Sequence, residues 1–190
     1  MKRKILLVAV LALFSGLLFA SPFGLRMGMD LNEIAQVCGG QRPEKVDTDC
    51  YIIVPEKKHP LFTKYYVWVD DTEGLYYIKA LSDDIQTNDY GTELQNKFFE
   101  ISNRISKSYG VPIINEKIDK SYVLTADAYW MMSIKDGARK LSATWMDNLK
   151  DDLYDVYLYV SAKSYNSGKV NLEYRFTNAD AVEDSQDDVF

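Results

Sequence analysis

The single histidine of the chain, His59, is the first residue to weigh for catalytic chemistry. Hydrolytic triads and most zinc sites need at least one histidine, placed beside a nucleophile or beside further metal ligands. His59 lies between Lys58 and Pro60 in a polar segment, and no Gly-x-Ser-x-Gly nucleophile motif occurs in the sequence. These surroundings favour a structural or solvated histidine, and we expect no catalytic residue.

The two cysteines, Cys38 and Cys50, offer either a nucleophile or a disulfide. A reactive thiolate needs a depressed pKa. Cys38 is expected near the C-terminal end of a helix, where the negative end of the helix dipole works against a thiolate. Because the N-terminus indicates export, as described below, the even cysteine count predicts a Cys38–Cys50 disulfide. Two free buried thiols are the alternative.

Paired carboxylates are plentiful, but their positions favour solvated turns. Four pairs occur: Asp70-Asp71, Asp83-Asp84, Asp151-Asp152 and Asp187-Asp188. Glycosidase chemistry requires two carboxyl groups across a cleft, and the sequence has no EF-hand spacing for calcium. Phosphate-binding glycine loops, Cys-x-x-Cys pairs and dinucleotide fingerprints are also absent from the sequence. We therefore expect no metal site and no cofactor.

Aromatic residues, which make up 13% of the chain, are the remaining signal. Tyr66, Trp68, Tyr157 and Tyr159 alternate with apolar residues in two strand-like runs, so they point away from the expected core. Aromatic residues favour strands in any case, and a sheet partly covered on both faces is the alternative explanation. Tyr and Trp are enriched at binding hot spots, so these four residues are the candidate partner-binding set.

Residues 1–20 have the three-part layout of a secretory signal peptide. A basic start at Lys2 to Lys4 precedes an apolar run from Ile5 to Phe14, and Ala20 closes the segment with a small side chain. We expect cleavage after Ala20 and a periplasmic or secreted protein. An uncleaved anchor is the alternative, although the run is shorter than the ~20 residues of a spanning helix.

The charge balance limits the partners. The chain carries 22 Lys and Arg against 28 Asp and Glu, and removal of residues 1–20 takes away three of the bases and none of the acids. Polyphosphate binding depends on clustered Lys and Arg, so we expect no nucleic-acid partner. No later segment is apolar and long enough to insert into a membrane after signal cleavage.

Capping signals and hydrophobic periodicity predict the helices. Asp30 and Glu33 form a capping box for a short helix that precedes Gly39-Gly40. Thr92 and Gln95 form a second capping box, for a helix that ends at Gly110. Segment 127–135 is compatible with a strand or with a short helix ending at Gly137, and its spacing favours the helix.

Strand-like runs predict strands over 50–54, 65–69 and 75–81, the last two on either side of a hairpin-length loop. Alternating apolar residues predict strands over 140–146, 155–162 and 169–177. Helix and strands thus recur as two tandem helix-then-strands units, 21–86 and 87–178, followed by an acidic tail over 179–190 that we expect to fray. Antiparallel strands with one apolar face need helices on that face. The predicted fold class is α+β, with helices packed on one face of antiparallel three-stranded meanders.

The stretch from Leu25 to Ile34, with Gly39-Gly40 and Pro43 after it, resembles the start of BamE-like (SmpA/OmlA) envelope proteins. Those proteins open with a Gly-Met-(Ser/Thr/Asp) cap, a short helix and a Gly-x-Pro, and a three-stranded antiparallel meander follows. A tandem pair of such units is similar to the architecture of secreted beta-lactamase inhibitor proteins. The chain also resembles a group of exported bacterial proteins through Pro55, the run from His59 to Phe62, and Gly74-Leu75.

Two functions from different classes follow. The first is an exported non-enzymatic binding or envelope-assembly module that contacts another envelope or extracellular protein through its sheet face or a loop. The second is a small exported hydrolase or ligand-processing enzyme, which a cleft holding His59 beside a buried carboxylate would indicate. The lone histidine, the missing nucleophile motif and the BamE-like opening favour the first.

Overall fold

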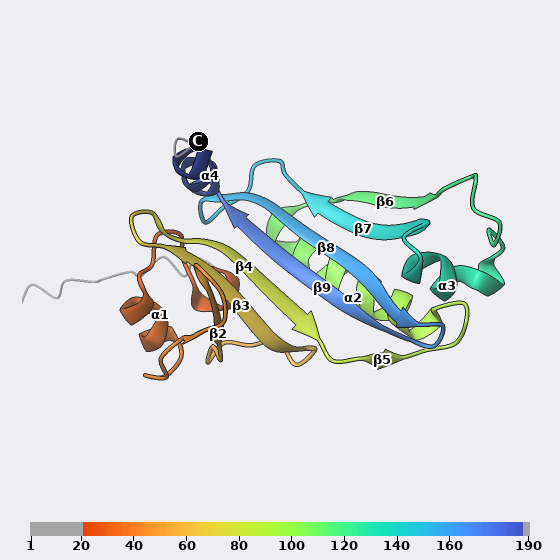
Figure 1. The fold of residues 1–190 in the computed structure, drawn as a ribbon, viewed down its shortest axis with the longest axis horizontal. Helices are drawn as coiled ribbons and strands as arrows, with labels where there is room; N and C mark the ends of the chain where they lie inside the picture. The colour runs from red at the N-terminus through yellow and green to blue at the C-terminus, as the bar shows by residue number, and fades with distance from the viewer. Residues whose placement is uncertain (1–20, 188–190) are drawn as a thin grey trace, which may run out of the picture.

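A computed structural model, which describes residues 21–187, shows one antiparallel sheet of nine strands (Figure 1). The strands follow the order β1-β2-β3-β4-β9-β8-β7-β6, and β5 pairs with β9 beside this path. Their bounds are β1 Glu44–Lys45, β2 Cys50–Ile53, β3 Phe62–Asp70, β4 Gly74–Ser82, β5 Ile85–Gln86, β6 Ile113–Ile118, β7 Arg139–Trp145, β8 Leu153–Ser164 and β9 Ser167–Phe176. The helices are η1 Pro22–Gly24, α1 Leu31–Val37, α2 Thr92–Tyr109, η2 Asp127–Tyr129, α3 Trp130–Lys135 and α4 Ala179–Asp187.

The expectation of helices packed on two separate three-stranded meanders is wrong. β4 pairs with β9 from Tyr77 opposite Arg175 to Leu81 opposite Asn171, and this contact joins the strands of 21–86 to those of 87–178 in one sheet. Alternation and turn residues predict which residues form strands, but they do not tell which strand edges meet. Pairing the two edges satisfies backbone groups that would otherwise remain open.

The core lies between this sheet and the helices on one of its faces. In Figure 1, α2 lies behind β8 and β9. Leu94, Phe98 and Ile101 recur at helical spacing and are buried in one cluster with Leu158 and Leu172 of those strands. α3 packs on β7 and β8. We call the opposite sheet face the open face.

Local signals predict most of these elements correctly. The α1 capping box is confirmed, because Asp30 Oδ1 accepts from the Glu33 amide at 2.8 Å and the Glu33 carboxylate accepts from the Asp30 amide at 3.0 Å. Segment 127–135 is helical, as its spacing favours. The six predicted strands are all present as β2, β3, β4, β7, β8 and β9.

Two local predictions fail, and one strand, β6, was not predicted. α2 begins at Thr92, but Gly91 is its N-cap, and Asn88 Oδ1 accepts from the Thr92 amide at 3.1 Å in place of a capping box. β6 lacks the alternation of a half-buried strand, because Ile113 and Ile114 are both exposed at the sheet edge. The acidic tail is helical over 179–187, and Arg175 of β9 forms ion pairs with Asp180 and Glu183 of α4.

The predicted signal peptide, 1–20, lies outside the described residues. None of the helices between residues 21 and 187 combines the length and the apolar character that crossing a bilayer requires.

The predicted Cys38–Cys50 disulfide is absent, and within the described chain both cysteines are free buried thiols. Strand alternation explains why. Ile53 of β2 belongs to the core cluster together with Cys38, whereas Cys50 lies three positions earlier and opposite Trp68, whose side chain is on the open face. The two thiols thus lie on opposite sides of the sheet. Sequence separation alone does not reveal this geometry.

Thiol labelling tests this arrangement. In denaturant without a reducing agent, we expect two labelled cysteines per chain. In the native protein we expect slow labelling, because burial raises the pKa of both the Cys38 and the Cys50 thiols and so suppresses the thiolate. If no free thiol is found in denaturant and two thiols appear after reduction, the Cys38–Cys50 disulfide is present and the free-thiol assignment is wrong.

An exposed ion cluster ties the β4–β5 connection to the β8–β9 hairpin. The Asp84 carboxylate lies 2.9 Å from Lys163 Nζ and 2.9 Å from Lys169 Nζ. Hydrogen bonds from Lys169 and Lys163 lower the pKa of Asp84 from 3.8 to about 2. A depressed carboxyl pKa stabilises the fold above the unfolded-state value, and that stabilisation is lost as the pH falls from 3.8 towards 2.

We therefore expect Asp84→Asn to lower the free energy of unfolding at pH 7, with the difference from wild type shrinking as the pH approaches 2. Urea unfolding followed by circular dichroism at several pH values measures it. Asp71→Asn in the β3–β4 turn is the control, because Asp71 forms no ion pair with any residue of 21–187. A difference that stays constant down to pH 2 contradicts the assignment.

Candidate functional site

The strand register places all four predicted aromatic residues on the open face. Tyr66 lies opposite Lys79, and Trp68 lies opposite Tyr77. Lys79 in turn lies opposite Glu173, and Glu173 lies opposite Tyr157. Directly opposed residues of antiparallel strands share a face. The two pairs that are about ninety residues apart in sequence thus belong to one surface across β3, β4, β9 and β8 (Figure 1).

Ring contacts connect these residues within each half of the surface. The Tyr66 and Trp68 ring centroids are 6.4 Å apart, and the Trp68 and Tyr77 rings meet edge to face at 5.0 Å. Tyr157 and Tyr159 stack with centroids 5.0 Å apart. All five side chains are half-buried. We call them, together with Lys79 and Glu173, the aromatic band.

Glu173 joins the two halves of the band. Its Oε1 lies 2.8 Å from Lys79 Nζ and accepts a hydrogen bond from the Tyr159 hydroxyl at 3.0 Å. Lys79 Nζ also lies 5.8 Å from the centroid of the Tyr159 ring. Burial and a hydrogen bond to Glu173 raise the pKa of Tyr77. These shared contacts fix the side chains in place before any partner binds.

By register the open face carries more basic than acidic side chains, and Glu44 of β1 and Asp155 of β8 are acids on it. Burial alone would lower the pKa of Lys79, but its hydrogen bonds to Glu173 and Tyr159 outweigh burial and raise it, so this lysine is charged. Glu173 is thereby neutralised within the band. Lys64 on β3, Lys117 on β6 and Lys140 on β7 share this face by register, and they form no ion pair with any residue of the described chain.

Sequence reasoning missed Tyr77, Lys79 and Glu173. The side of the sheet on which Tyr77 and Lys79 lie could have been predicted, because they flank the core residue Ile78. The pairing of β4 with β9, which brings Lys79 beside Glu173, could not be predicted from the sequence.

His59 lies in a separate pocket. Its Nδ1 accepts from the Leu61 amide at 3.2 Å, and burial lowers the pKa of the imidazole, with the charge of Arg104 adding to that effect. The pocket has a volume of about 510 Å³. Its lining residues within the described chain are Val54, Lys58, His59, Pro60, Phe62, Thr63 and Tyr65, none of which carries a carboxylate.

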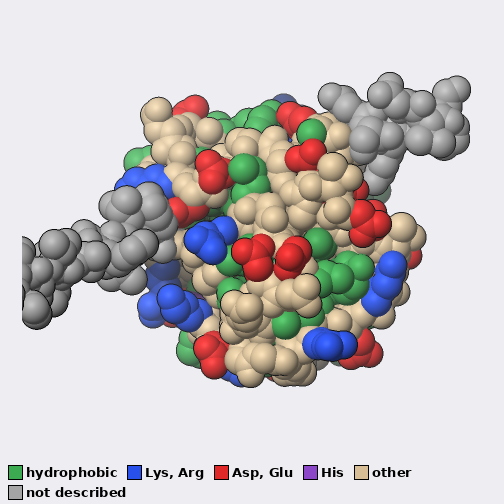
Figure 2. Space-filling view, turned by 90° about the vertical axis from the view of Figure 1, so that its left-hand side faces the viewer, with side chains coloured by type: hydrophobic (Ala, Val, Ile, Leu, Met, Phe, Trp, Pro, Cys, Tyr) green, Lys and Arg blue, Asp and Glu red, His purple; other side chains and the backbone are tan. Residues whose placement is uncertain are grey.

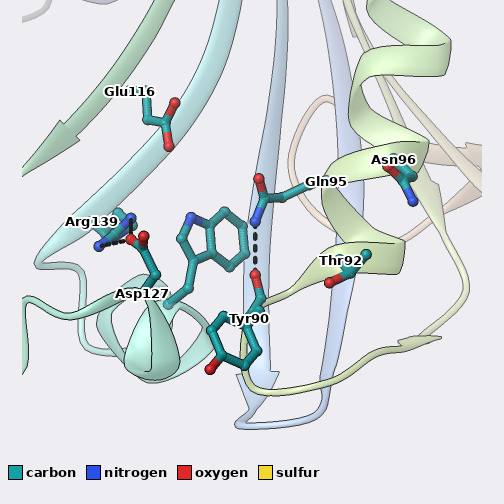
Figure 3. Close-up of a pocket in the computed structure, with 8 residues that line it drawn as sticks. Tyr90, Thr92, Gln95, Asn96, Glu116, Asp127 and Arg139 are labelled. Carbon is teal, nitrogen blue, oxygen red and sulfur yellow. Dashed lines mark hydrogen bonds and ion pairs between the residues drawn. The ribbon is translucent and has the colours of Figure 1, made fainter.

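Another pocket lies between the start of α2, η2 and the strands β6 and β7 (Figure 3). Its volume is about 310 Å³, and it is lined by Tyr90, Thr92, Gln95, Asn96, Glu116, Asp127, Trp130 and Arg139. In Figure 3, Arg139 and Asp127 meet on the side opposite α2, and Gln95 Nε2 donates to the Tyr90 carbonyl at 2.7 Å. No sequence motif marks this pocket, because its residues come from four separate segments.

The end of the molecule that carries α1 has no continuous apolar surface in view. Figure 2 shows hydrophobic side chains there in small patches between acidic and basic ones. Within residues 21–187, no group of three or more His, Cys, Asp or Glu side chains is arranged to hold a metal ion.

No protein-family model matches the chain, and no curated protein or solved structure matches it. The BamE-like resemblance of the opening residues thus receives no further identification from these comparisons.

Proposed function

We propose that this chain is an exported, non-enzymatic module that binds an acidic segment of another envelope or extracellular protein through its open face. The observation that carries this proposal is the aromatic band, in which Tyr66, Trp68, Tyr157 and Tyr159 share one rigid surface. The signal-peptide layout of residues 1–20 and the BamE-like opening support the location.

The chemistry of the band suits a polypeptide partner. Tyr and Trp supply large contact areas with few rotatable bonds, so little side-chain entropy is lost when a partner binds. Their half-buried rings still have surface to bury. Unpaired lysines around them attract acidic groups and repel basic ones, which gives specificity and speeds association. The partner is therefore acidic, with apolar or aromatic side chains between its carboxylates.

The hydrolase alternative has less support from the geometry. The cleft that holds His59 offers no carboxylate among its described lining residues to orient the imidazole. A lowered histidine pKa, caused mainly by burial, is also the ordinary result of partial enclosure.

Selection from a random peptide display library tests the proposal. We expect the mature chain to enrich peptides rich in Asp and Glu with interspersed aromatic or aliphatic residues. We expect their binding to weaken as salt is raised, because exposed charges are screened. Enrichment of basic peptides would contradict the proposal, and so would tight binding of single-stranded oligothymidine, which would point to nucleic acid.

A further inference from the structure

Two buried donors have no acceptor in the pocket between the start of α2, η2, β6 and β7, which we call the α2 pocket. Trp130 is 2% exposed and Arg139 is 8% exposed, and both line the pocket. The indole Nε1 of Trp130 and the guanidinium Nε of Arg139 form no hydrogen bond with any described residue. A buried donor without a partner costs roughly 1–3 kcal/mol. Two such donors beside one cavity indicate a place that an acceptor from outside the chain can fill.

Both terminal nitrogens of Arg139 already have acceptors. Its Nη2 donates to the Thr125 carbonyl at 3.0 Å, and its Nη1 lies 3.4 Å from Asp127 Oδ1. Asp127, which is mostly exposed, balances the guanidinium charge. Glu116 also lines the pocket and forms no ion pair within residues 21–187.

This charge balance selects the ligand. A simple anion would meet the unpaired Glu116 carboxylate, and a simple cation would meet the two N–H donors. A neutral hydroxyl group accepts from the indole and guanidinium N–H groups and also donates to a carboxylate. The amides of Gln95 and Asn96 and the exposed ring of Tyr90 add polar and apolar contacts around the same space.

We propose that this pocket binds a neutral, hydroxyl-rich ligand, a single saccharide unit. Its hydroxyls accept from Trp130 Nε1 and Arg139 Nε and donate to Glu116. The pocket volume of about 310 Å³ is at the low end of small-molecule sites, which span roughly 300–1,000 Å³, and so matches a ligand of one ring. Both donor nitrogens are shielded from water, so the ligand reaches them only when side chains that line the pocket shift as it enters. The site is separate from the open face and does not depend on its function.

The three tryptophans give an NMR test in the ¹⁵N-labelled mature chain. Trp130 reports on this pocket, Trp68 on the open face, and Trp145, whose Nε1 donates to the Gly110 carbonyl at 3.0 Å, on neither. Glucose and N-acetylglucosamine are titrated separately, with glycine as a zwitterion and sulfate as an anion. We expect a saturable shift of the Trp130 indole N–H signal with at least one sugar, and little change at Trp68 and Trp145.

A matched pair of β6 variants sharpens the test. Glu116→Gln removes the carboxylate and is expected to weaken sugar binding about tenfold, since hydrogen bonds to charged groups are the stronger ones. Lys117→Gln, on the next residue and the other sheet face, leaves sugar binding unchanged. The proposal is overturned by a Trp130 signal that stays fixed up to about 50 mM sugar, enough to fill most of a site with a Kd of about 10 mM. A response only to glycine or sulfate, or a sugar response only at Trp68, also overturns it.

Discussion

Simultaneous replacement of Trp68 and Tyr159 by serine is expected to weaken binding of the selected acidic peptides by at least about a hundredfold, because central aromatic residues cost about 2 kcal/mol or more each when truncated at binding hot spots. The two residues come from opposite halves of the aromatic band. Trp68 contacts Tyr77, and Tyr159 holds Glu173 through its hydroxyl. The double variant therefore removes apolar contact area in both halves and the hydrogen bond from Tyr159 to Glu173, while the ion pair between Glu173 and Lys79 remains. Isothermal titration calorimetry with one selected peptide measures the loss.

The control makes the same kind of substitution, an aromatic residue to serine, at two positions outside the aromatic band. Tyr129→Ser with Tyr165→Ser removes two tyrosines that are 47% and 57% exposed and lie outside the band. We expect this variant to bind as the wild type does. Circular dichroism must show both double variants folded, because the band residues are half-buried. Equal loss of affinity in the two variants, or unchanged affinity in the first, would contradict the assignment of the open face.

Gly74→Ala is expected to lower the free energy of unfolding by roughly 4 kcal/mol, among the larger effects of a single substitution. Gly74 has a φ of +68°, a region that costs a non-glycine residue about 1–2 kcal/mol. A Cβ there would also lie 2.3 Å from the Gly28 carbonyl oxygen, which is backbone and has no rotamer to change. The same stretch is held by hydrogen bonds from the Gly28 amide to the Leu75 carbonyl and from the Leu75 amide to the Met29 carbonyl.

Gly40→Ala separates the two contributions. Gly40 has a φ of +87°, but beyond its two chain neighbours nothing lies within 4 Å of the position that an alanine methyl group would take. We expect this substitution to cost about 1 kcal/mol, the conformational part alone. Urea unfolding of both variants gives the comparison. Similar losses in the two variants would show that the contact between Gly74 and Gly28 yields more easily than its geometry indicates.

The faces of the sheet were predictable, and its connectivity was not. Period-two alternation in 155–162 correctly assigns Tyr157 and Tyr159 to one side and Leu158 to the other, since a half-buried strand must segregate its side chains. The same reasoning, applied to β2, would have set Cys50 apart from the core. The disulfide prediction was based on compartment and cysteine count alone. It was wrong because neither of them tells on which side of the sheet each thiol lies.

The α2 pocket lay beyond sequence reasoning for a different reason. In the sequence, nothing distinguishes Trp130 from other core aromatic residues, or Arg139 from other basic residues at the end of a strand. Their significance depends on two unused N–H groups beside one cavity, and this is a property of packing. Whether a buried N–H group finds an acceptor depends on its tertiary neighbours, so no local sequence pattern indicates an unpaired donor.

The position of β9 sets the order in which this protein can assemble. β9 follows every other strand along the chain, yet it lies between β4 and β8 in the sheet. While the chain is still emerging from a ribosome or a translocation channel, β4 and β8 both present open edges. Once β9 emerges, its hairpin with β8 closes locally, whereas its pairing with β4 spans about ninety residues of sequence. Such long-range pairing is slow, so the nascent chain needs protection of those two edges until its last strand arrives.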